Sequence, residues 1–134
     1  MKIMLDTNIL ISAALFPDGK AASAYKKAIM PPFEPIVCDY IIAELQRKFS
    51  QKFPDRITTL ESFLAAARLR IVIVPTPNTQ KQEERLIRDV KDRPILRAAI
   101  SSNAELLLTG DKDFLEASVS GLKIIGIPEF LSME

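Results

Sequence analysis

The sequence predicts an α/β fold, a three-layer sandwich of helices around a mostly parallel sheet of about five strands. Short apolar runs alternate along the chain with segments of helical spacing. Two of these runs stop abruptly, at Asp6-Thr7-Asn8 and at Thr109-Gly110-Asp111, as buried parallel strands do at the edge of a sheet. With 134 residues, 48% hydrophobic and 26% charged, residues 1–134 are expected to form a single compact domain of about 15 kDa.

Each expected element has a local reason. The predicted strands are short apolar runs that end at a polar residue or a proline: residues 3–5, 34–38, 70–74, 106–108 and 123–125. The predicted helices combine apolar residues at helical spacing with a capping residue, or with Pro or Gly at the end: residues 9–15, 20–30, 39–52, 55–67, a helix starting at 92–94, a short helix around 114 and a last turn at 128–131. Asp39 and Asp92 are the expected N-caps of their helices. Residues 79–91 are the most polar segment and are predicted as a loop or an exposed helix.

Composition excludes several classes of chemistry. Lys and Arg number 18 and Asp and Glu 17, so the net charge of +1 excludes a polybasic tail and a strongly acidic protein. The chain has no His, which excludes Ser-His and Cys-His nucleophiles and the usual zinc sites. Cys38 is the single cysteine and has no intrachain partner. No apolar run approaches the roughly 18–20 residues of a membrane span, so we expect a soluble, cytoplasmic protein.

Several carboxylates are predicted to meet at one edge of the sheet. Asp6 directly follows the first strand and Asp111 the fourth, and the carboxyl ends of parallel strands share an edge, where ligands bind in such sheets. Glu44 flanks the apolar stripe of the helix after strand two. Asp92 heads the helix that leads into strand four, and Asp113 lies two residues beyond Asp111. The edge is therefore a candidate acidic site.

Such a cluster requires neutralisation. Two unit charges about 4 Å apart repel by roughly 4 kcal/mol at an effective dielectric near 20, so either some carboxylates are protonated or a cation binds them. An all-oxygen set suits Mg²⁺ or Mn²⁺, and these ions assist attack on phosphate esters, which predicts a phosphodiester or another phosphate as substrate. Taken singly, each residue has a simpler explanation. Asp6 and Asp92 also fit plain helix caps, and Glu44 fits a solvated helix position. Asp111-Lys112-Asp113 fits an ordinary turn. The prediction of a metal site therefore depends on all of these carboxylates occurring together, and not on any one of them.

Four motifs in this order resemble those of PIN-domain ribonucleases: residues 1–10 (MKIMLDTNIL), 41–45 (IIAEL), 91–96 (KDRPIL) and 108–114 (LTGDKDF). The subgroup they are most similar to is the toxins of toxin–antitoxin pairs of the VapC type. The resemblance implies metal-dependent endonucleolytic hydrolysis of RNA, a homodimer and an antitoxin that covers the site. It implies that Asp6, Glu44, Asp92 and Asp111 bind the metal, although Asp89 stands close enough to Asp92 to compete for that role.

The resemblance also implies supporting roles. Asp113 would be an accessory carboxylate, Asn8 would orient a carboxylate or a phosphate, and Thr109 would hydrogen-bond within the site. Sequence proximity makes five cations candidates for binding the RNA backbone, and each also fits an ordinary solvated helix face: Lys48, Lys52, Lys91, Arg93 and Arg97. With nine aromatic residues and no Trp, the chain gives little sign of a platform for stacking bases.

Three other functions compete with the nuclease. A haloacid-dehalogenase-like phosphatase would need a second Asp two residues after Asp6, where this chain has Asn8. A response-regulator receiver domain would need an Asp after the third strand, which ends in Val74-Pro75. A PIN-like binding or assembly module with a silent site would be expected to lack the acidic set, whereas all four positions are acidic here.

Overall fold

The computed structural model describes residues 1–133 and contains a five-stranded sheet in which every pairing is parallel. The strand order is β3-β2-β1-β4-β5. The strands are β1 (Lys2–Leu5), β2 (Glu34–Cys38), β3 (Val72–Val74), β4 (Leu106–Leu108) and β5 (Lys123–Ile125). The predicted α/β class and parallel sheet are therefore confirmed.

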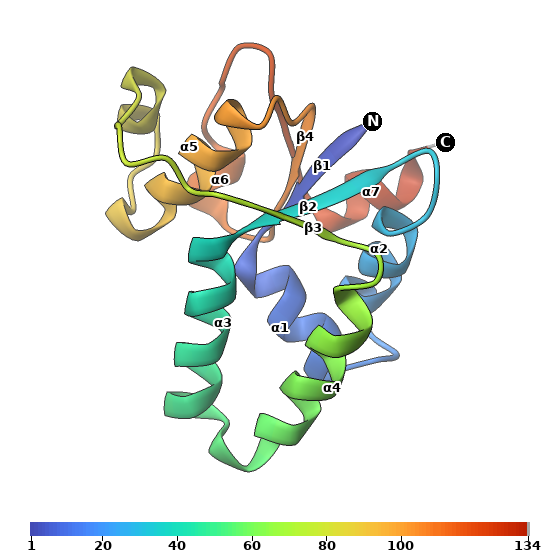
Figure 1. The fold of residues 1–134 in the computed structure, drawn as a ribbon. Coiled ribbons are helices and arrows are strands. Elements are labelled where there is room, and N and C mark those ends of the chain that lie inside the picture. The colour runs from blue at the N-terminus through green and yellow to red at the C-terminus, as the bar shows by residue number, and fades with distance from the viewer. Residues whose placement is uncertain (134) are drawn as a thin grey trace.

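Helices cover the sheet in two layers. The α-helices are α1 (Thr7–Leu15), α2 (Lys20–Ala28), α3 (Asp39–Lys52), α4 (Ile57–Ala67), α5 (Arg93–Ser101), α6 (Lys112–Leu115) and α7 (Ile127–Ser132). Three short 3-10 helices complete the set: η1 (Pro54–Arg56), η2 (Gln82–Leu86) and η3 (Val90–Asp92). Helix α1 contacts α2, α3 and α4, and Figure 1 shows α1, α3 and α4 on one side of the sheet and α5 on the other. Among the described residues, no helix has both the length and the apolarity that crossing a bilayer requires.

The sheet has its switch point between β1 and β4. Strand order runs from β1 to β2 and β3 in one direction and from β4 to β5 in the other, and the ends of β1 and β4 are in register, with Leu5 opposite Leu108. The amide of Asp6 continues this ladder by donating to the carbonyl of Leu108 at 3.0 Å. Parallel sheets of this kind bind ligands where the strand order reverses. Asp6 and the residues after β4 therefore occupy the expected place for a site.

The core explains why the strands lie where the sequence predicts them. All three residues of β4 are buried, as are Ile3, Met4 and Leu5 of β1, and the fully buried Phe49, Phe114 and Phe130 pack around them. A strand covered on both faces reads as an uninterrupted apolar run, so β1 and β4 are recognisable from three residues each. The edge strand β3 is different, because Val72 and Ile73 are exposed.

The structure corrects several predicted boundaries. The first helix begins at Thr7, two residues earlier than predicted, because Asp6 caps it by accepting from the amide of Thr7. The third strand begins at Val72, since residues 67–71 are still involved in the turns that end α4. Asp39 is the first residue of α3, with Cys38 at the cap position. The polar segment 79–91 is neither an open loop nor a regular helix, because η2 and η3 form within it.

Candidate active site

Asp6 lies at the centre of the candidate site. It follows β1, is only 2% exposed, and uses both carboxylate oxygens: Oδ1 accepts from the Thr7 amide and Oδ2 from the Thr109 hydroxyl, each at 2.7 Å. Burial raises the pKa of Asp6 to about 6, and the nearby Glu44 and Asp111 add to the increase, while the two hydrogen bonds oppose it. A buried carboxylate with a raised pKa gains from a neighbouring cation.

Thr109 links Asp6 to the acidic residue after β4. Its fully buried hydroxyl donates to Asp6 and accepts from the amide of Asp111 at 3.0 Å. Asp111 in turn caps α6, with Oδ1 accepting from the amide of Asp113 at 2.8 Å. Thr109 therefore connects Asp6 with the turn after β4, which holds Asp111 beside Asp6.

Asp92 points toward the other carboxylates instead of capping its helix. It stands at the N-cap position of α5, as predicted, but its side chain makes no capping bond there. Its Oδ2 is buried and has no hydrogen-bond partner among the described residues. Burial raises the pKa of Asp92 to about 8, and the facing Asp111 and Asp6 contribute. Asp89, the alternative carboxylate, caps η3 through the Lys91 amide at 3.0 Å and is exposed.

Glu44 completes the acidic set from α3. The residue is 7% exposed, and Oε1 accepts a short hydrogen bond from the hydroxyl of Thr7. Arg47, one turn along, lies 3.8 Å from Oε2. Thr7 was not singled out from the sequence, although its place directly after the first strand, between Asp6 and Asn8, was a usable signal. The two threonines Thr7 and Thr109 orient Glu44 and Asp6 respectively.

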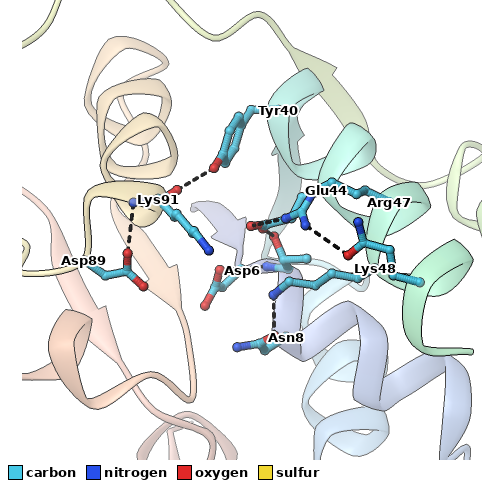
Figure 2. Close-up of polar contacts among 10 residues, drawn as sticks. Asp6, Asn8, Tyr40, Glu44, Arg47, Lys48, Asp89 and Lys91 are labelled. Atoms are coloured by element: carbon cyan, nitrogen blue, oxygen red, sulfur yellow. Dashed lines mark hydrogen bonds and ion pairs between the residues drawn. The ribbon is translucent and has the colours of Figure 1, made fainter.

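Glu44, Asp92 and Asp111 open onto a cleft of about 360 Å³ between α3 and the turn before α5. Figure 2 shows Asp6 between two walls, with Glu44, Arg47 and Lys48 on one side and Asp89 and Lys91 on the other. Lys48 donates to the amide oxygen of Asn8 at 3.4 Å. Both signs of charge line the cleft, whose lining residues are Asn8, Glu44, Arg47, Lys48, Gln51, Lys52, Asp89, Lys91, Asp92 and Asp111.

Five predicted site residues are not part of this lining: the buried Asp6 and Thr109, and Arg93, Arg97 and Asp113. Arg97 is held elsewhere: Nε and a terminal nitrogen donate to the two oxygens of the buried Glu84 at 3.0 and 2.9 Å. Arg93 donates to the carbonyl of Ile87 at 3.0 Å. Asp113 faces Arg88 at 3.8 Å. The cations that the structure brings to the cleft are thus Lys48, Lys52 and Lys91 from the predicted set, together with Arg47.

The donor set fits a hard divalent cation in chemistry and charge. Asp6 and Asp92 both have raised pKa values, and the buried Oδ2 of Asp92 lacks a partner among the described residues. Carboxylate oxygens are the ligands that Mg²⁺ and Mn²⁺ prefer. In the described residues 1–133, however, no three acidic or thiol side chains are gathered tightly enough to form a metal centre as they stand. The carboxylates are neighbours rather than a preformed cage.

Comparison with known proteins identifies the family. The family model described as "PIN domain" matches residues 2–113, which include every acidic residue named above. This chain belongs to the PIN-domain family. The resemblance inferred from the four motifs is therefore confirmed. Among curated proteins, none matches the PIN chain by sequence.

Solved structures share the PIN fold at low sequence identity. VapBC2 from Rickettsia felis, bound to a DNA fragment from its promoter, has a TM-score of 0.70 at 21% identity, covering 94% of this chain and 98% of its own. VapBC-1 from nontypeable Haemophilus influenzae has a TM-score of 0.63 at 18% identity, and the match covers 96% of this chain and 99% of its own. VapC20 from Mycobacterium tuberculosis is described as a toxin cleaving the sarcin-ricin loop. Its TM-score is 0.62 at 16% identity, and the match covers 89% of this chain and 97% of its own. The likeness shows that the fold is that of VapC toxins.

Proposed function

We propose that this PIN domain is an endoribonuclease that hydrolyses RNA phosphodiester bonds with the help of Mg²⁺ or Mn²⁺. The observation that carries the proposal is the position of Asp92: its carboxylate makes no bond to its own helix, faces Asp6 and Asp111, and has one buried oxygen without a partner among the described residues. A carboxylate held in this way costs folding free energy unless a cation offsets it. A structural cap would instead have its oxygens on the helix amides.

In this proposal Asp6, Glu44, Asp92 and Asp111 would hold the cation, with Asp113 as an accessory carboxylate. When bound, the cation supplies Lewis acidity toward phosphate oxygens and lowers the pKa of water. Thr109 keeps Asp6 oriented through its 2.7 Å bond, and Thr7 does the same for Glu44. Asn8 stands at the mouth of the cleft, where its amide can orient a phosphate or a carboxylate.

Cations of the chain would hold the RNA backbone. Lys48, Lys52 and Lys91 line the cleft around the acidic centre, and Arg47 of α3 lines it as well. Their attraction for phosphates offsets the repulsion between a polyanion and the carboxylates. Arg93 and Arg97, whose side chains bind Ile87 and Glu84, are assigned no direct contact with RNA in this proposal.

We further propose that residues 1–134 act as a single-domain toxin of a toxin–antitoxin pair in the cytoplasm. Support comes from the PIN family and from three neighbours described as VapBC assemblies, whose VapC fold this chain shares. An antitoxin protein and a second copy of the chain are the partners expected on this basis. Co-expression with the gene product encoded beside it, followed by size-exclusion chromatography with light scattering, measures both associations.

The first prediction concerns cleavage. Purified protein incubated with end-labelled single-stranded RNA should cut it with Mn²⁺ or Mg²⁺ and not with EDTA. Asp6→Asn should reduce the rate by at least about a hundredfold, because one acidic ligand and its charge are lost. Asp18→Asn, a matched change at an exposed turn between α1 and α2, should cut like the parent. Equal rates for Asp6→Asn and the parent would refute the assigned site.

A further inference from the structure

The hydroxyl of Tyr40 joins the two walls of the cleft. Tyr40 lies in the first turn of α3, and its hydroxyl donates to the backbone carbonyl of Lys91 at 2.6 Å, across 51 residues of sequence. Figure 2 shows the ring reaching from α3 to the turn that carries Asp89 and Lys91. The peptide that accepts this bond directly precedes Asp92. The contact therefore acts on the backbone of a site residue rather than on its side chain.

Both ends of Tyr40 are fixed. Its amide donates to Oδ1 of Asp39 at 2.8 Å, and the same oxygen accepts from the amide and the hydroxyl of Thr76 at 3.0 and 2.5 Å. These bonds tie the start of α3 to the chain that leaves β3. Tyr40 also lies four residues before Glu44, on the same face of the helix. One rigid path thus runs from Glu44 through Tyr40 to the peptide before Asp92.

Asp92 needs such a restraint. Its Oδ2 finds no hydrogen-bond partner among the described residues, and the carboxylates of Asp6 and Asp111 face it. Neither a capping bond to its own helix nor, among the described residues, a partner of Oδ2 therefore holds the turn before α5 in place. The bond from Asp89 to the Lys91 amide is internal to that turn and cannot oppose its displacement as a whole. The bond from Tyr40 comes from the opposite wall and does oppose it.

We propose that Tyr40 is a positioning residue, whose hydroxyl sets the separation of Asp92 from Glu44 by holding the Lys91 carbonyl against α3. The inference rests on the proposed nuclease function of this cleft. In the presence of Mg²⁺ or Mn²⁺, the same bond keeps the cleft from widening when RNA enters. Tyr40 itself makes no contact with the substrate in this scheme.

The test replaces Tyr40 with Phe, which removes only the hydroxyl. Tyr25→Phe is the matched control, because the chain has two tyrosines and Tyr25 packs its ring on Phe63 between α2 and α4, 5.0 Å between centroids. Tyr40→Phe should lower kcat about three- to tenfold and leave the KM for RNA unchanged. It should weaken Mn²⁺ binding by a similar factor, because a factor of this size corresponds to the loss of one hydrogen bond. Tyr25→Phe should change neither quantity.

A double-mutant cycle separates positioning from a general structural role. In an Asp92→Asn background, Tyr40→Phe should add little further loss of Mn²⁺ affinity, because the group it positions has already been changed. An additive loss would overturn the proposal, and so would a raised KM at constant kcat, which would mean that the hydroxyl touches RNA. Equal behaviour of the two Tyr→Phe variants would overturn it as well.

Hydrogen–deuterium exchange of the metal-free protein makes the result independent of catalysis. Peptides covering residues 88–92 should exchange faster in Tyr40→Phe than in the parent or in Tyr25→Phe. Faster exchange in a protein that cuts no RNA would mean that the Tyr40 restraint exists and that the nuclease function is wrong. Unchanged exchange in a protein that does cut RNA would mean that the nuclease function is right and that Tyr40 does not restrain the turn.

Discussion

Asp6 and Asp92 differ in how their charge is accommodated. Asp6 is the more deeply buried, yet two short hydrogen bonds favour its ionised form, and its pKa rises only to about 6. Asp92 is less buried, yet burial raises its pKa to about 8 because the facing Asp111 and Asp6 add to the increase, and its Oδ2 has no hydrogen-bond partner among the described residues. The two hydrogen bonds to Asp6 thus keep its pKa below that of Asp92, although Asp6 is the more deeply buried residue. Asp92 is the residue whose charge the metal-free fold tolerates least.

This difference predicts how stability depends on pH. Both carboxyls have folded-state pKa values above the unfolded value of 3.8, so the folded protein binds more protons and the free energy of unfolding falls as pH rises from about 4 to 8. Asp92→Asn should remove the part of the fall between about pH 6 and 8, raising Tm at pH 8 by about 4 °C for a gain of about 1 kcal/mol. Thermal melts in EDTA at pH 5, 6.5 and 8 measure it.

Two comparisons make the pH prediction specific. Asp18→Asn removes an exposed carboxylate and should leave the pH profile of the parent unchanged. Added Mn²⁺ should raise Tm at pH 8 more than at pH 5, because protons compete with the cation for the same oxygens. A parent protein whose Tm rises from pH 5 to 8 in EDTA would show that Asp92 is not strained in solution.

At the scale of elements, a buried ion pair holds the polar segment before α5. Glu84 of η2 is 4% exposed, and Arg97 of α5 binds both of its oxygens while donating to the carbonyl of Pro77 at 2.8 Å. These hydrogen bonds hold the pKa of Glu84 below its usual range. The segment that carries Asp92 is therefore fixed to the body of the protein at a point outside the cleft.

Breaking this pair should be costly. Arg97→Lys keeps the charge but loses the planar fork, and should lower the free energy of unfolding by about 1.5 kcal/mol, the value of one lost hydrogen bond to a charged group. Urea denaturation measures the change. Glu129→Gln breaks the exposed pair of Glu129 with Lys123, 3.2 Å apart, and should have almost no effect. Equal costs at the two sites would mean that the Glu84–Arg97 pair adds nothing beyond a surface contact.

The elements also show where sequence reasoning succeeds and where it stops. Asp6 and Asp111 could be placed because each follows an apolar run that only a fully covered strand explains. The direction in which the Asp92 carboxylate points could not be predicted, because Asp-Arg-Pro fits a plain helix cap equally well. The carboxylates around it also come from distant parts of the chain. Glu84 and Tyr40 were missed for the same reason: their partners lie 13 and 51 residues away, with no local pattern to indicate the contact.

For the molecule as a whole, the distribution of charge matters more than its sum. The net charge is +1, yet cations of α3 and of the turn before α5 surround an acidic centre at the switch point of the sheet. Lys48 and Lys52 lie one turn apart on α3, so both can face one strand of phosphates. A nearly neutral chain can thus attract RNA at one edge only, with the carboxylates at the centre of that edge.

This arrangement predicts a salt dependence of RNA binding. In the cleavage-deficient Asp6→Asn background, fluorescence anisotropy with single-stranded RNA should give a log Kd that rises linearly with log salt concentration. Lys48→Ala and Lys52→Ala should each lower that slope by about 0.7, the value for one phosphate contact with a single strand. Lys20→Ala, an exposed lysine on α2, should leave it unchanged. If all three variants bind with the parent's slope, the strand does not follow α3 and the RNA must enter the cleft from another side.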